Sequence, residues 1–145
     1  MMYLILYSLL LGVTPHTRTQ FADVTDVQIR KSGDLYSFQV TLSSPDTGCD
    51  QYADWWEVVS EEGELLYRRI LSHSHTSEQP FTRGGGSLKL NPVENVWIRA
   101  HMNNTGYGGL TMYGNASDGF QLKEMAEGFT TELDQKKPLP DGCRF

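Results

Sequence analysis

The chain has 145 residues, a length typical of one domain. Its formal net charge of −6 at pH 7 argues against a general nucleic-acid binder, which usually presents a basic patch, and against adhesion to anionic membranes. Hydrophobic residues make up 39% of the sequence, which is enough for a globular core.

The sequence begins with an uncharged apolar run from Tyr3 to Val13. This run is shorter than the roughly 20 residues that a membrane-spanning helix needs, but it suits the hydrophobic core of a secretory signal. No Lys or Arg precedes it and no small-x-small cleavage motif follows it, so a buried strand or helix is the alternative. We predict a signal or targeting segment at residues 1–20 and a single domain at residues 21–145. We also predict that the mature protein is secreted or periplasmic and has no integral membrane span.

Two strands are expected next, Ala22 to Lys31 and Leu35 to Leu42, joined by a turn at Lys31 to Asp34. The second strand alternates strictly, which indicates one buried face. Its apolar positions are Tyr36, Phe38, Val40 and Leu42.

A hairpin is expected around Glu61-Glu62-Gly63, because a three-residue loop that ends in glycine is a common connection. Pairing Ser60 with Glu64 would set the register, since side chains alternate between the two faces of a strand. The core face would then carry Trp56, Val58, Leu66, Arg68 and Ile70. The opposite face would carry Trp55, Glu57, Val59, Leu65, Tyr67, Arg69, Leu71, His73 and His75.

The second half of the chain predicts short strands separated by loops. A long loop is expected at Thr76 to Ser87, because three consecutive glycines hold a regular element poorly. The strands that follow are expected at Leu88 to Leu90, Glu94 to Met102, Leu110 to Tyr113 and Phe120 to Leu122, and a short helix at Gly128 to Lys137. Together these elements predict an all-β fold, an immunoglobulin-like antiparallel β-sandwich with a short C-terminal helical segment.

The chain contains two cysteines, Cys49 and Cys143. Two free thiols would be unusual in an oxidising compartment, so we expect a disulfide that ties the C-terminal tail to the body of the domain. The loop-entropy model gives about 4–5 kcal/mol for closing such a long loop. A metal or redox role is the alternative, but the sequence has no CxxC motif and no histidine next to either cysteine.

Three histidines form the candidate metal site. His73 and His75 are two residues apart on one expected strand, and His101 lies on the polar face of a later strand. If these strands are neighbours, the three imidazoles could converge on copper or zinc. The alternative is that they are surface or loop-end histidines held by ordinary hydrogen bonds.

Aromatic and cationic side chains form the candidate ligand-binding site: Trp55, Tyr67, Arg69, Arg83, Trp97 and Arg99. Such a face could bind a sugar or other small molecule, an anion or a protein partner. Cross-strand pairs that simply stabilise a sheet are the alternative. No GxSxG motif or paired nucleophile and base is present, so a hydrolase is the least favoured option and no cofactor is expected beyond possible copper or zinc.

Four stretches carry a resemblance to known proteins: SPDTGCDQYADWWEVVSEEGELLYRRIL, the segment from SHSH to EQPFTR, RAHMNNTGYGG and the terminal PLPDGCRF. They resemble a group of uncharacterised exported bacterial proteins, over roughly Val24 to Phe145. The resemblance implies a secreted single domain and supplies no catalytic residue. We therefore predict a secreted or periplasmic binding or interaction module that does not act as an enzyme.

Overall fold

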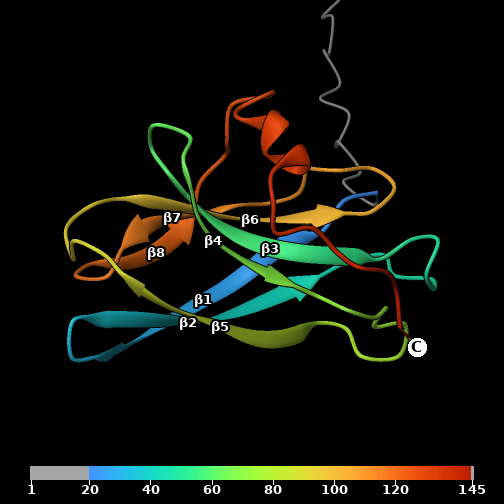
Figure 1. The fold of residues 1–145 in the computed structure, drawn as a ribbon, viewed down its shortest axis with the longest axis horizontal. Coiled ribbons are helices and arrows are strands. Elements are labelled where there is room, and N and C mark those ends of the chain that lie inside the picture. Colours follow the sequence, from blue (N-terminus) through green and yellow to red (C-terminus); the bar gives the residue numbers. More distant parts are fainter. Residues whose placement is uncertain (1–19, 145) are drawn as a thin grey trace, which may run out of the picture.

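The computed structural model describes residues 20–144, so the predicted signal segment lies outside the described residues except for Gln20. The chain forms two antiparallel sheets, stacked as two layers in Figure 1. One sheet has the strand order β1-β2-β5 and the other β4-β3-β6-β7-β8. The elements are β1 (Asp23–Ser32), β2 (Leu35–Ser43), β3 (Ala53–Ser60), β4 (Leu65–Ile70), β5 (Phe81–Lys89), β6 (Val96–Met102), β7 (Met112–Asn115), β8 (Gly119–Leu122) and a 3-10 helix, η1 (Thr131–Gln135).

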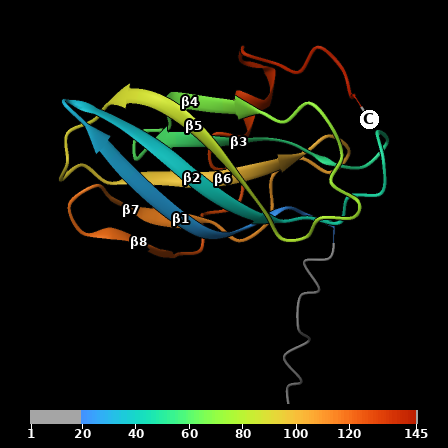
Figure 2. The same cartoon turned by 90° about the horizontal axis from the view of Figure 1, so that it is seen from below.

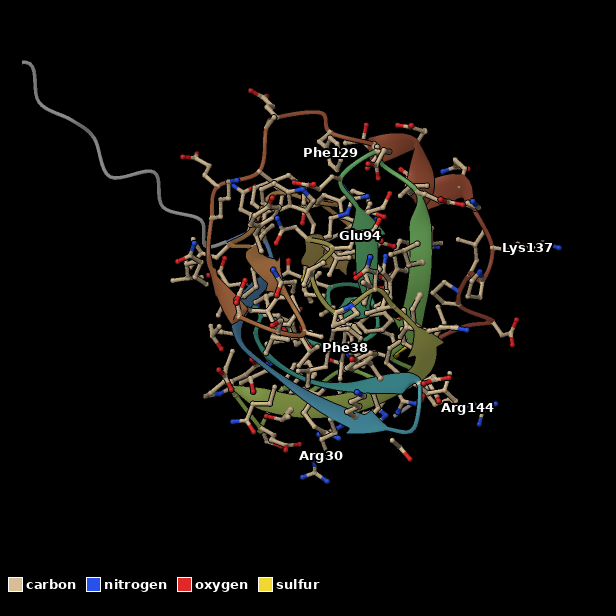
Figure 3. The ribbon with its side chains drawn as sticks, turned by 90° about the vertical axis from the view of Figure 1, so that its left-hand side faces the viewer. Arg30, Phe38, Glu94, Phe129, Lys137 and Arg144 are labelled. Carbon is tan, nitrogen blue, oxygen red and sulfur yellow. A yellow bond between two sulfur atoms is a disulfide. The ribbon has the colours of Figure 1, made fainter. Side chains whose placement is uncertain are left out.

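The β1–β2 hairpin supplies one side of the core, and its pairing confirms the prediction. The alternating residues of β2 point between the sheets and are buried, while β1 has a bulge between Val24 and Asp26. Phe38 lies between the two layers in Figure 3, with its ring centroid 6.5 Å from that of Trp56 in the facing sheet. The fold is thus all-β and sandwich-like, because each sheet buries one apolar face against the other.

The register of the β3–β4 hairpin differs from the prediction. Val59 does pair with Leu65, but a bulge between Val58 and Val59 shifts the pairs beyond it. Glu57 therefore lies opposite Arg68 and Trp55 opposite Ile70. A one-residue bulge moves every later side chain to the other face of its strand, so the predicted faces of β4 are exchanged from Tyr67 onward, while Leu66 packs against the core as predicted.

The predicted glycine loop is also wrong, because Arg83 and the three glycines belong to β5, which pairs with β2. Gly85 allows close packing between β5 and the facing five-stranded sheet. A Cβ on Gly85 would lie 2.6 Å from the Tyr67 hydroxyl and 3.0 Å from the Trp56 ring in the other sheet. The absence of a side chain lets β5 approach the facing sheet closely. Figure 2 shows β5 passing in front of β3 and β4.

The C-terminal helix is shorter than predicted and is only the 3-10 turn η1. Two left-handed residues explain this, since Gly128 has φ +77° and Thr130 has φ 44°. A residue with positive φ cannot continue a right-handed helix. In the described part of the chain, no helix is long and apolar enough to cross a membrane.

The C-terminal segment (residues 129–144) lies on the side of the five-stranded sheet that faces away from the three-stranded sheet (Figure 1). The Cys49–Cys143 disulfide ties its end to the loop between β2 and β3, which confirms the predicted pairing. The amide of Arg144 also donates a hydrogen bond to the Ser72 carbonyl at 2.6 Å. The segment is therefore attached at its end by a covalent bond and by backbone pairing.

Candidate functional site

The outer face of the five-stranded sheet centres on a buried carboxylate. Glu57 of β3 is fully buried between Arg68 of β4 and Arg99 of β6. Each guanidinium donates its Nε hydrogen to one carboxylate oxygen, at 2.7 Å from Arg68 and 2.8 Å from Arg99. Such a buried triad is stable only as a unit, because removing one partner would leave a desolvated charge.

The two arginines also hold the C-terminal segment. Arg68 donates to the carbonyls of Leu133, Lys136 and Pro138. Arg99 donates to the carbonyls of Phe129 and Thr130 at 2.8 and 3.0 Å. The triad has two positive charges and one negative charge, and the carbonyl dipoles of this segment solvate the excess positive charge. The face proposed from sequence is thus largely covered by the chain itself.

Stacked rings continue this face toward the end of β6. Trp55 lies parallel to His101, with ring centroids 3.7 Å apart, and the Arg68 guanidinium carbon lies 4.2 Å from a Trp55 ring centroid. His101 Nδ1 shares a 2.6 Å hydrogen bond with Asp54. Burial raises the pKa of Asp54, and this hydrogen bond and the neighbouring charge of His101 oppose the rise. The His101 ring nitrogen and the Asp54 carboxylate are therefore already paired with each other.

Of the six ligand-binding residues predicted from sequence, Trp55, Trp97 and Arg99 share the outer face, as β3 and β6 are neighbours. Tyr67 instead packs on Trp56 in the core, with centroids 5.6 Å apart, and Arg69 pairs in register with Trp56 and is exposed. The bulge in the hairpin causes both differences. Arg83 lies on β5 in the other sheet, where it forms an ion pair with Glu78 at 3.1 Å.

The predicted convergence of three histidines is wrong. His101 stacks on Trp55 at the outer face, whereas His75 stacks on Phe81 of the other sheet, with centroids 3.8 Å apart. His73 and His75 do lie together, at 4.5 Å between centroids. Among residues 20–144, no group of three or more His, Cys, Asp or Glu side chains could hold a metal ion. β4 ends at Ile70, so His73 and His75 lie beyond the strand and do not continue its face as the sequence had predicted.

A cleft of about 400 Å³ opens beside the covered face. One wall is the end of β6 with the loop that follows it, and the other is the segment after β8. Figure 3 shows Phe129, one of its lining residues, on the outer side of the five-stranded sheet. The lining residues are Phe21, Arg99, Ala100, Tyr107, Gly108, Gly109, Thr111, Glu124, Met125, Ala126, Glu127, Gly128, Phe129 and Thr131.

Tyr107 connects the cleft to the buried ion pairs of the outer face. Its hydroxyl is buried and lies near the Glu57 carboxylate, while the Arg99 guanidinium lies 3.7 Å above its ring. Burial raises the pKa of Tyr107, and the nearby negative charge of Glu57 and the contact of the hydroxyl with that carboxylate add to the effect. Tyr107 therefore stays a neutral phenol at physiological pH, and its hydroxyl belongs to the buried groups around Glu57 rather than to the open part of the cleft.

Of the predicted site residues, only Arg99 lines this cleft. Phe21 precedes β1, and Tyr107 and Phe129 lie in two loops, so no periodic pattern marks a face for any of them. The only available signal was the density of aromatic and glycine residues around Tyr107 and Phe129, which is typical of loops that carry a site.

Comparison with known proteins gives one relationship to report. The chain is 39% identical over 99 residues to a protein of Halomicrobium mukohataei named "Putative lipoprotein". The match covers 68% of this chain but only 49% of that protein, so the chain spans about half the length of its curated relative. No family model matches the chain, and no solved structure matches it. The relative's name states no activity, which supports the resemblance to an uncharacterised family.

Proposed function

We propose that this protein is an exported binding module whose ligand occupies the cleft between the Tyr107 loop and the segment around Phe129. The observation that supports this most directly is the cleft of about 400 Å³ itself, whose lining combines the half-buried rings of Phe21 and Phe129 with polar side chains. A concave, partly apolar site with a few polar groups is the usual form of a small-molecule site.

The rest of the outer face supports a structural role for Trp55, Glu57 and Arg68 in this proposal. Glu57 and Arg68 direct their polar groups to each other and to the C-terminal carbonyls, and Arg68 also lies over the Trp55 ring, so these residues hold the segment beside the cleft in place. Rigid walls favour binding because less conformational freedom is lost when the ligand is ordered. The expectation that the chain binds its ligand without converting it stays a prediction.

Export is supported by two independent features. Disulfides persist mainly in oxidising compartments, and the chain contains the Cys49–Cys143 bond. The relative named "Putative lipoprotein" points the same way. We therefore propose a secreted, periplasmic or membrane-attached protein, consistent with the apolar run at Tyr3 to Val13.

We also infer that the sandwich is immunoglobulin-like. As in that architecture, strands 1, 2 and 5 share one sheet and strands 3, 6 and 7 share the other. The fourth strand pairs with β3 here, whereas in constant-type domains it joins the sheet of the fifth strand. The loops at one end of such a sandwich commonly carry binding sites.

Copper or zinc binding is the weaker candidate function. It would now depend on His73 and His75 alone, whose rings are 4.5 Å apart. Both ring nitrogens of His75 are buried and partnerless, which favours the idea. Two imidazoles are fewer ligands than the three or four protein ligands of ordinary zinc sites.

The proposed function is tested by filling the cleft. Ala126→Trp places a large side chain in the lining at an exposed position, so we expect it to abolish ligand binding with little change in melting temperature. Binding is measured by amide chemical shifts with three probes of one shape: 2-phenylethylammonium, 2-phenylethanol and 3-phenylpropionate. We expect at least one probe to shift the amides of Gly108, Gly109 and Gly128, and none to do so in the variant.

The matched control is Asn91→Trp, at an exposed position of the β5–β6 loop that does not line the cleft. This variant should bind the probes as the native protein does. If no probe shifts the cleft amides, or if Ala126→Trp leaves the shifts unchanged, the cleft is not a binding site and the proposal is wrong.

A further inference from the structure

The charges around the cleft define the chemistry of its ligand. The cation in its lining, Arg99, is only 1% exposed. Its donors face Glu57 and the carbonyls of Phe129 and Thr130, with Met125 sulfur at 3.8 Å. An anion could reach this guanidinium only by breaking the contacts that hold the C-terminal segment. The anionic ligand considered from sequence therefore fits this site poorly.

The carboxylates in the lining are exposed to solvent. Glu124 and Glu127 lie on the segment after β8, but Glu124 already interacts within the chain, so Glu127 is the acidic group of the rim that a ligand can reach. The chain as a whole has a formal net charge of −6. An acidic rim on an acidic protein attracts cations and repels anions before contact.

The apolar walls lie next to these carboxylates. Phe21 and Phe129 present half-buried aromatic rings, and Met125 and Ala126 add aliphatic surface between them. A cation over an aromatic face gains an electrostatic attraction that water does not cancel. The cleft thus offers both an apolar contact and an acidic rim to one ligand.

The protein already uses this kind of contact on the same face. The ammonium group of Lys123 lies 3.9 Å from the Tyr113 ring and 5.4 Å from the Trp97 ring. The Trp97 ring in turn neighbours Phe129, with centroids 6.4 Å apart. The outer face is therefore suited to holding ammonium groups over aromatic rings.

We infer that the ligand is a small organic cation, with an ammonium group at the Glu127 rim and an apolar body against Phe129 and Met125. This inference rests on the proposed function. Amines with aromatic or alkyl substituents combine these properties.

The test compares the affinities of the three probes, which share one shape and differ in charge. We expect 2-phenylethylammonium to bind about three- to thirtyfold more tightly than 2-phenylethanol at low salt, from one carboxylate contact and one cation–π contact. The 3-phenylpropionate anion should bind most weakly of the three. Raising the ionic strength should reduce the advantage of the cation, because salt screens exposed charges.

Charge reversal provides the matched variants. Glu127→Lys should remove the preference for the cation, while Glu94→Lys should keep it, because Glu94 is equally exposed but lies in the loop before β6 and outside the lining. Equal affinity of 2-phenylethylammonium and 2-phenylethanol, with cleft shifts for both, would overturn the cation inference and leave the binding proposal intact. Absence of binding by all three probes would instead overturn the proposed function.

Discussion

At the scale of single residues, the site shows how burial changes the role of a polar side chain. From the sequence, Arg99 was expected to bind a ligand, Arg68 to lie on the core face and Glu57 on the opposite face. In the structure the two guanidinium groups both donate to the Glu57 carboxylate. His75 is the opposite case. Only 5% of it is exposed, it stacks on Phe81, and neither ring nitrogen has a hydrogen-bond partner. Such a histidine is held in the neutral form.

His75 should make the protein lose stability in mild acid. Its pKa is lowered, first by burial and then by the charges of Arg83 and His73, which outweigh Asp46 and Glu78. The unfolded chain therefore takes up a proton before the folded one does. Stability is fully present above the unfolded pKa of about 6.5 and is lost as pH falls through the lower folded pKa.

We expect His75→Phe to flatten this pH dependence below about pH 6.5, because it removes the titrating group and keeps the ring stack. It should also stabilise the protein by about 1 kcal/mol at pH 7, since two unsatisfied buried nitrogens disappear. Urea unfolding at several pH values measures both effects. His73→Gln, at an exposed position, is the control and should keep most of the slope. An unchanged slope in His75→Phe would show that other groups cause any acid lability.

At the scale of elements, glycine spacing decides how closely the two sheets pack. Gly84 and Gly85 are adjacent on β5 but point to opposite faces. A Cβ on Gly85 would meet the Tyr67 ring and Trp56, which belong to the packed core. A Cβ on Gly84 would meet the end of the Gln39 side chain, 2.5 Å away, and that side chain can move.

Gly85→Ala should therefore destabilise the protein by about 1–3 kcal/mol through overpacking. Gly84→Ala is the matched control, and we expect a change within about 0.5 kcal/mol, typical of surface substitutions. Chemical denaturation of both variants gives the comparison. Equal effects would mean that backbone freedom of β5, rather than contact with the facing sheet, accounts for the glycines.

At the scale of the whole molecule, the C-terminal segment joins the sandwich through two separate attachments. Carbonyls from Phe129 to Pro138 accept hydrogen bonds from Arg68 and Arg99, and Leu133 is buried. Beyond them, the Cys49–Cys143 disulfide spans a sequence separation of 94 residues. The first attachment forms a wall of the cleft and the second fixes the tail.

Replacing both cysteines with serine should lower the free energy of unfolding by about 2–5 kcal/mol, as expected for a bond that closes a long loop. Because the arginine contacts remain, amide hydrogen exchange should rise at Arg144 and stay slow at Leu133 and Lys136. Probe binding in the cleft should persist. Fast exchange throughout residues 129–144 would show that the disulfide alone holds the segment in place.

The sequence by itself determined the features that depend on local pattern. Alternation in Leu35 to Leu42 correctly predicted which residues face the core, because a strand has a strict period of two. The presence of two cysteines in a chain expected to be exported correctly predicted their disulfide. The all-β class followed from the same short strands and turns.

Only the tertiary structure decided where the bulge in β3 and β4 falls, whether the glycines form a strand, and which groups cover the outer face. A bulge costs little locally but exchanges Tyr67 and Arg69 with Arg68 and Ile70, so no local pattern predicts it. The cleft likewise depends on two loops meeting, and their positions come from contacts distant in sequence. The sequence thus established the strands, whereas long-range packing placed Tyr107, Glu127 and Phe129 around one cleft.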